Sequence, residues 1–172
     1  MKFIIRQETI DDYTEIYSLI KTAFETAKVK DGSEQDFAEK LREKDCYIPE
    51  LALVAETPDN RLIGHIMLTK TYIETDNGLY EALLIAPVSV LLECRNMGVG
   101  SSLVREGFKR AEEMGYKAVF LCGDPAYYHR FGFRPTSEFG IKSKQDIPAQ
   151  YVMGCELEAG ALEHIMGVAD FV

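Results

Sequence analysis

The segment best suited to bind an anion is Arg95-Asn96-Met97-Gly98-Val99-Gly100-Ser101-Ser102, which joins a predicted strand to a predicted helix. Its two glycines let the backbone approach a bulky ligand and turn N–H groups toward it. The first N–H groups of a helix have no partner within it, and the helix dipole adds about 0.3–2 kcal/mol of attraction for negative charge. These features are typical of a phosphate or diphosphate site. A tight turn at Gly98 without any ligand fits the spacing equally well.

Two other glycine motifs fit this segment poorly. A dinucleotide fingerprint that starts at Gly98 would need a glycine at position 103, where the chain has Leu103. A P-loop needs Gly-Lys-Ser or Gly-Lys-Thr, and neither occurs in the chain.

The predicted elements around the segment form a β-α-β unit. Tyr80–Leu92 is predicted as a strand, Gly98–Gly115 as an amphipathic helix and Lys117–Cys122 as a buried strand. The two strands of such a unit lie parallel. A short helix over 125–130 and a late strand at Tyr151–Leu157 follow.

The first half of the chain predicts two helices and an antiparallel meander. Apolar residues at helical spacing predict a helix over 10–26, and Ser33 and Asp36 indicate the start of another. Asp76-Asn77-Gly78 predicts a type I′ hairpin. Further strands are predicted at Lys2–Gln7, Leu51–Glu56 and Arg61–Ile73. Because the hydrophobic period changes between 2 and 3.6, the fold class is mixed α/β (α+β).

Length and composition favour a single domain over residues 1–172. No apolar run approaches the ~20 residues of a membrane span, and the apolar stretch at Met1–Arg6 is too short for a secretory signal. The net charge of −9 argues against a nucleic-acid partner. The cysteines are far apart, without a Cys-x-x-Cys pair, so we expect no metal site and a reduced, cytoplasmic protein.

Arg95-x-x-Gly98-x-Gly100 resembles the acetyl-CoA signature of the GNAT superfamily of N-acetyltransferases. Gly123-Asp124-Pro125-Ala126-Tyr127-Tyr128-His129-Arg130-Phe131-Gly132-Phe133 is similar to the corresponding segment of its YhbS-like branch. The order of predicted elements resembles the whole GNAT domain, so the resemblance covers nearly the full chain. It implies a central mixed, mostly antiparallel sheet flanked by helices, with the β-α-β unit binding acetyl-CoA.

The resemblance also implies roles for individual residues. The backbone groups of Val88 and Val90 would pair with the pantetheine arm like an added strand. Asn96 stands where the family often has a glycine, which would stiffen the loop. The diphosphate would be held by the segment after Arg95, through the amides of Met97, Gly98, Val99, Gly100, Ser101 and Ser102.

Tyr128 is the proton donor that the resemblance implies, because it lies four residues before Gly132. Tyr127 is the alternative, and both rings could instead only pack the short helix. Attack of an amine on a thioester expels a thiolate, whose acid has a pKa of about 8.5 if cysteine is a fair guide, against about 10 for tyrosine. The mismatch of about 2 kcal/mol is small beside an enzyme's whole barrier reduction.

No residue stands out as the base that takes the proton of the amine. His129 adjoins the donor and is predicted to be a surface residue. His65 lies beside Gly64, which predicts a bulge or a close backbone approach, and could face either the acceptor slot or the core. The carboxylates expected near the acceptor are Glu50, Glu74, Asp76 and Glu81.

The sequence therefore predicts an acetyltransferase that acts on an unidentified amine of a small molecule or a protein, as a monomer or homodimer. The acceptor would contact residues 24–50 and 70–82, which the resemblance implies to be the variable parts of the fold. The alternative is a GNAT module that senses acyl-CoA without turnover. A purely structural partner protein would bind no CoA.

Overall fold

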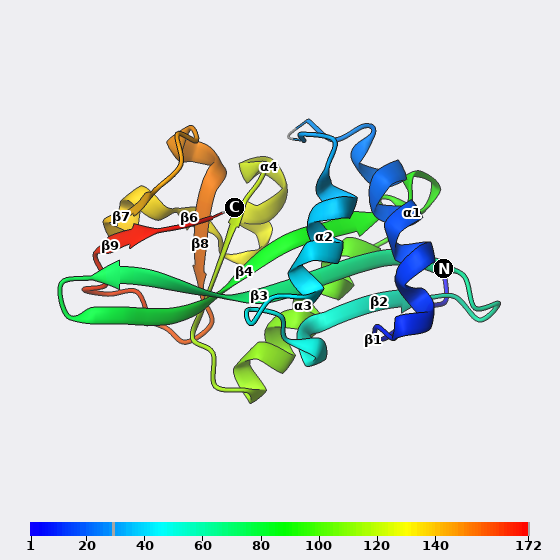
Figure 1. Ribbon diagram of the computed structural model, residues 1–172, viewed down its shortest axis with the longest axis horizontal. Helices are drawn as coiled ribbons and strands as arrows, with labels where there is room; N and C mark the ends of the chain where they lie inside the picture. Colours follow the sequence, from blue (N-terminus) through cyan, green and yellow to red (C-terminus); the bar gives the residue numbers. More distant parts are fainter. Residues whose placement is uncertain (29, 172) are drawn as a thin grey trace. The chain divides into compact units, whose positions relative to one another are not determined.

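The computed structural model describes residues 1–28 and 30–171 (Figure 1). The chain divides into two compact units. The first unit comprises Met1–Thr69 and Ala86–Arg110, and the second comprises Lys70–Ile85 and the chain from Ala111 onward.

The helices are α1 (Tyr13–Phe24), α2 (Glu34–Arg42), α3 (Val99–Glu113) and α4 (Pro125–Tyr128). The strands are β1 (Ile4–Gln7), β2 (Ala52–Glu56), β3 (Leu62–Thr75), β4 (Gly78–Val90), β5 (Ala118–Cys122), β6 (Arg134–Pro135), β7 (Ile141–Ser143), β8 (Val152–Glu156) and β9 (Gly167–Ala169).

In the first unit, helices cover both faces of the antiparallel strands β1, β2 and β3 (Figure 1). Val54 on β2 packs with Ile16 of α1 and Ala38 of α2. On the other face, a Cβ at Gly64 would lie 2.9 Å from the side chain of Leu103 in α3. Successive side chains of a strand alternate between faces, so Gly64 faces α3, whereas His65, opposite Val54, faces α1 and α2.

Gly64 shows both features that the sequence predicted for it. The small residue admits the close approach of α3. A register shift also falls beside it, because Ala55 pairs with Gly64 while Glu56 pairs with Leu62.

The second unit contains the parallel pair of strands. β4 pairs with β5 through Leu83 opposite Val119 and Leu84 opposite Phe120, and α3 is the connection between these strands. The predicted β-α-β unit is therefore confirmed. β8 lies antiparallel to β5, β6 lies beside β8, and β9 pairs with β3 and β7. The sheet is mixed, and most of these pairs are antiparallel, as the fold class requires.

Most predicted boundaries agree with the structure within a few residues. The helix predicted over 10–26 begins as a 3-10 turn at Ile10–Asp12 and continues as α1. β6, β7 and β9 were not predicted, because two or three residues are too few to display a hydrophobic period. Across the described residues, no helix is both long and apolar enough to cross a membrane.

Candidate functional site

The turn between β4 and α3 adopts left-handed backbone conformations at two positions. Asn96 has φ +60° and Gly98 has φ +84°. Glycine adopts this region without a steric cost, and asparagine is among the few other residues that tolerate it. The departure at Asn96 from the family's usual glycine therefore preserves the backbone that the turn needs.

The first turn of α3 presents amide groups without intrahelical partners. Ser102 donates its N–H to the carbonyl of Gly98 at 2.9 Å, which is the first bond of the helix. The N–H groups of Val99, Gly100 and Ser101 precede that bond, so they are the groups that can hold an anion. Because the Ser102 amide is already bonded to Gly98, Ser102 can contact a ligand only through its hydroxyl. The amides predicted to hold the diphosphate therefore no longer include that of Ser102.

The guanidinium of Arg95 contacts the end of α1. It donates to the carbonyl of Ala23 at 2.6 Å and to the hydroxyl of Thr26 at 2.9 Å. A third bond, 3.5 Å long, runs from Nε to the carbonyl of Val90. The Arg95 side chain therefore joins the turn before α3 to α1, and cofactor contact by Arg95 itself stays a prediction.

The end of β4 alternates between exposed and buried residues. Val88 and Val90 are partly exposed, whereas the side chain of Ser89 between them is buried. The Ser89 hydroxyl has no hydrogen-bond partner among the described residues. Nothing in the sequence distinguishes Ser89 from its neighbours on the strand.

Tyr128 lies at the end of α4, which Asp124 caps by accepting the Ala126 N–H at 3.0 Å. The ring lies against Gly123, where an added Cβ would be 2.5 Å from Cε2 of the tyrosine. It also packs edge-on against Tyr127 and Phe133, with ring centroids 4.9 and 5.7 Å away. The position of the ring is thus set by the absence of a side chain at Gly123.

The environment of Tyr128 keeps its hydroxyl protonated. Burial raises the pKa of Tyr128 above its ordinary value, and the neighbouring Tyr127 and Asp124 raise it further. A proton donor is therefore available over the whole physiological range. The higher pKa also makes proton transfer to a thiolate more unfavourable than transfer from an exposed tyrosine would be.

Two other residues of this segment have structural partners. His129 is exposed, as predicted, and its Nδ1 bonds to the carbonyl of Phe133 at 2.9 Å. The guanidinium of Arg130 lies over the ring of Tyr127, 4.7 Å from its centroid. These contacts close the turn that follows Tyr128.

The four carboxylates expected near the acceptor are exposed. Glu74 pairs with Lys144 at 2.5 Å, and Glu81 accepts a bond from the hydroxyl of Tyr72 at 3.2 Å. Glu50 and Asp76 are also exposed. These groups resemble solvated surface carboxylates, so none of them is distinguished as a base by burial or by an unusual partner.

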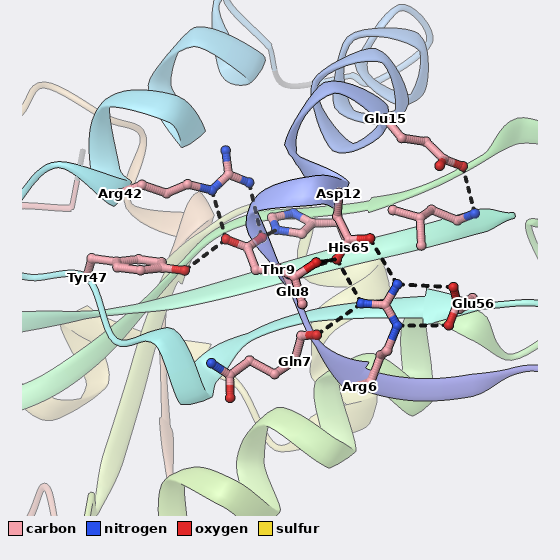
Figure 2. A network of polar contacts seen from close by, with 11 residues as sticks. Arg6, Gln7, Glu8, Thr9, Asp12, Glu15, Arg42, Tyr47, Glu56 and His65 are labelled. Carbon is pink, nitrogen blue, oxygen red and sulfur yellow. Dashed lines mark hydrogen bonds and ion pairs between the residues drawn. The ribbon is translucent and has the colours of Figure 1, made fainter. Parts of the chain in front are cut away.

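A buried polar cluster of Glu8, Arg42, Tyr47 and His65 lies beneath α1 and α2 (Figure 2). Glu8 accepts hydrogen bonds from Arg42 Nε at 2.8 Å and from the Tyr47 hydroxyl at 2.9 Å. The Nε2 atom of His65 lies 2.8 Å from the second oxygen of Glu8. The side chains of Glu8 and His65 have no solvent-exposed surface. Sequence reasoning missed this cluster, and only the position of His65 within a strand pointed toward it.

The ion pair between Glu8 and Arg42 determines which residues of the cluster are charged. Although burial disfavours an ionised carboxylate, the bonds from His65 and Arg42 hold the pKa of Glu8 at about 2. Burial lowers the pKa of His65, and the nearby Arg42 cation acts in the same direction. At neutral pH the cluster therefore contains one anion, one cation and a neutral imidazole.

Comparisons with known proteins identify the same family throughout. The family model described as an acetyltransferase (GNAT) domain matches residues 4–136. The Escherichia coli K12 N-acetyltransferase YjhQ is 32% identical over 123 residues, which are 70% of this chain and 66% of YjhQ. YhbS of the same organism, also an N-acetyltransferase, is 27% identical over 168 residues, which are 98% of this chain and 95% of YhbS.

Two solved structures resemble the whole chain. Escherichia coli YhbS in complex with CoA has a TM-score of 0.88 and 25% identity, over 100% of this chain and 91% of that one. A GNAT acetyltransferase from Brucella melitensis in complex with acetyl-CoA has a TM-score of 0.79 and 25% identity, over 99% of this chain and 96% of that one.

Proposed function

Because this chain belongs to the acetyltransferase (GNAT) family, we propose that it transfers the acetyl group of acetyl-CoA to an amine. The observation that carries this proposal is the turn before α3. Gly98 at φ +84° directs the chain into a helix whose first amides have no partner of their own. A diphosphate at this helix end would accept those N–H groups and benefit from the helix dipole.

The cofactor would extend along the end of β4. In this proposal the backbone of Val88 and Val90 binds the pantetheine arm, and the Ser101 and Ser102 hydroxyls lie beside the diphosphate. The complexes of YhbS with CoA and of the Brucella melitensis protein with acetyl-CoA support this ligand.

Tyr128 would donate the proton that the departing thiolate needs. The C–S bond of the thioester breaks as the amine nitrogen bonds to the acetyl carbon, and the sulfur takes the phenolic proton. In support, burial holds Tyr128 in its protonated form.

Thiol release from acetyl-CoA, measured across a panel of small amines and peptide amines, tests the proposed reaction. We expect release that depends on at least one amine and saturates with acetyl-CoA. Gly100→Val provides the control, because a side chain in the first turn of α3 would block the approach of the diphosphate. Unchanged acetyl-CoA affinity in this variant would contradict the proposed binding site.

The same panel separates the enzyme from a sensor. Calorimetry that detects tight CoA binding, together with no turnover on any amine, would favour a sensing module. Absence of CoA binding would contradict both functions. We further propose that the protein acts in the cytoplasm, consistent with four free cysteines.

A further inference from the structure

Two buried polar atoms on adjacent strands have no hydrogen-bond partner among the described residues. They are Nδ1 of His65 on β3 and Oγ of Ser89 on β4. Buried polar atoms in folded proteins nearly always have a partner, in the protein or in ordered water, and an exception calls for an explanation. These two exceptions occur in the same unit.

The pairing of the strands places the two residues opposite each other. The amide of Leu91 donates to the carbonyl of Ile63 at 3.0 Å. We count two residues along each antiparallel strand from this bond, toward the interior of the pair. The two residues reached in this way also lie opposite each other, with their side chains on the same face of the sheet. Those residues are Ser89 and His65, so both side chains belong to the face that α1 and α2 cover.

The bond to Glu8 decides which nitrogen of His65 carries the proton. The carboxylate is ionised and can only accept, so Nε2 must be the donor. A neutral imidazole protonated at Nε2 has a free lone pair at Nδ1. His65 therefore has a basic nitrogen, Nδ1, that no described residue contacts by a hydrogen bond, on the same face of the sheet as Ser89.

Ser89 links this nitrogen to the proposed cofactor site. It lies between Val88 and Val90, whose backbone we propose to bind the pantetheine arm. A hydroxyl can accept one proton while it donates another, and two facing polar atoms can share a single water molecule. A path for a proton thus leads from the cofactor strand to a buried base.

We infer that His65 is the proton acceptor of the transfer reaction, reached through the Ser89 hydroxyl and positioned by Glu8. This inference rests on the proposed function. As the amine nitrogen bonds to the acetyl carbon, its N–H bond breaks and the proton passes to Ser89 Oγ, directly or through water. Oγ releases its own proton through a bridging water molecule to Nδ1 of His65, while the thiolate takes the proton of Tyr128. After product release, solvent carries a proton from the imidazolium back to Tyr128.

The charges around His65 are compatible with this role. Glu8 stabilises the imidazolium that forms, as a carboxylate does for a catalytic histidine. The Arg42 cation destabilises the imidazolium, so the proton would readily leave His65 again. Tyr47 and Tyr13, the latter with its ring 4.0 Å from the Arg42 guanidinium, complete the surroundings without adding charge.

His65→Gln and Ser89→Ala test the relay, with Glu56→Gln as the matched control. Glutamine retains an N–H donor for Glu8 but cannot take a proton, and we expect it to lower kcat by about 10²–10³-fold. Ser89→Ala should lower kcat by about tenfold, with the KM for acetyl-CoA within about twofold of wild type in both variants. Glu56→Gln weakens the ion pair with Arg6, which lies outside the cluster, and should leave kcat and its pH profile unchanged. The relay is wrong if the folded His65→Gln and Ser89→Ala variants have the same kcat as the wild type. It is also wrong if all three variants lose activity in proportion to their loss of stability.

The pH profile and the imidazole itself give further readouts. A base must be neutral, and burial lowers the pKa of His65, so wild-type kcat should fall at a pH below the ordinary histidine value of about 6.5. Ser89→Ala should weaken that acid limb. Nitrogen NMR of labelled histidines should show His65 neutral with the proton on Nε2, and a proton on Nδ1 would overturn the relay. This measurement needs no acceptor, so it tests the relay even if no amine is acetylated. If the wild type acetylates an amine and the variants do so equally well, the relay is contradicted while the proposed function is not.

Discussion

The Nη2 atom of Arg95 lies 2.6 Å from the carbonyl oxygen of Ala23, so the signature arginine of the turn before α3 contacts the last turn of α1. The carbonyls at a helix end have no partners within the helix, and a cation there complements the negative end of the dipole. The arginine therefore joins two segments that are more than seventy residues apart in the sequence.

Replacement of Arg95 should affect stability more than cofactor affinity. We expect Arg95→Ala to destabilise the protein by about 2 kcal/mol, because it removes charged hydrogen bonds to Ala23 and Thr26. Acetyl-CoA affinity should fall by less than about tenfold, since the guanidinium is directed at α1. Denaturant unfolding and calorimetry measure the two quantities. Arg61→Ala, at an exposed ion pair with Glu93, should change neither. A large loss of affinity with normal stability would show that Arg95 binds the cofactor directly.

Tyr128→Phe should lower turnover without changing cofactor binding. The ring and its packing remain, and only the proton is lost, so kcat should fall by about 10²–10⁴-fold while the Kd for acetyl-CoA stays nearly constant. Tyr127→Phe is the matched control on the adjacent residue and should retain activity. Equal losses in kcat and affinity for Tyr128→Phe would refute the donor role.

Gly123→Ala should disturb catalysis through the position of Tyr128. The new methyl group would overlap the tyrosine ring, at 2.5 Å from Cε2, so the ring must move. We expect a lower kcat and an altered near-ultraviolet circular dichroism spectrum. Because the two residues act through one ring, the double variant with Tyr128→Phe should be no slower than Tyr128→Phe alone. Additive losses would mean that Gly123 acts independently.

The buried cluster should make the protein sensitive to acid in two steps. His65 has its pKa lowered by burial, so its contribution to stability is complete above its unfolded pKa of about 6.5 and is lost as pH falls below it. Glu8 has its pKa lowered to about 2, so its contribution is complete above about pH 4.3 and is lost as pH falls toward 2. Thermal unfolding from pH 8 to pH 3 should show both declines.

Substitutions assign each step to its residue. His65→Gln should remove the decline that begins near pH 6.5. Glu8→Gln should cost about 3–5 kcal/mol at pH 7, because it leaves the Arg42 cation buried without its anion. A flat profile between pH 7 and pH 5 in the wild type would show that His65 does not remain neutral in the folded protein.

The sequence by itself determined the features that depend on neighbouring residues. The place of the hairpin at Asp76-Asn77-Gly78, the strand-to-helix turn at Gly98 and the β-α-β unit follow from local backbone preferences and hydrophobic period. The predicted type I′ geometry of the hairpin is wrong, because Gly78 has a positive φ but Asn77 does not. Such signals are contained within one element or its boundary, so no knowledge of distant contacts is required. The family motifs belong to the same category, because their residues lie close together along the chain.

Only the tertiary structure decided which distant side chains meet. Glu8, Arg42 and His65 come from a strand end, a helix and another strand, and each alone reads as an ordinary polar residue. The exclusion of solvent makes them one electrostatic unit, since burial requires every charge to find a partner. The same holds for Arg95, whose sequence motif indicates an anion site while its guanidinium holds the carbonyl of Ala23. Periodicity gives the face on which a residue lies, whereas its partner depends on how the helices pack against the strands.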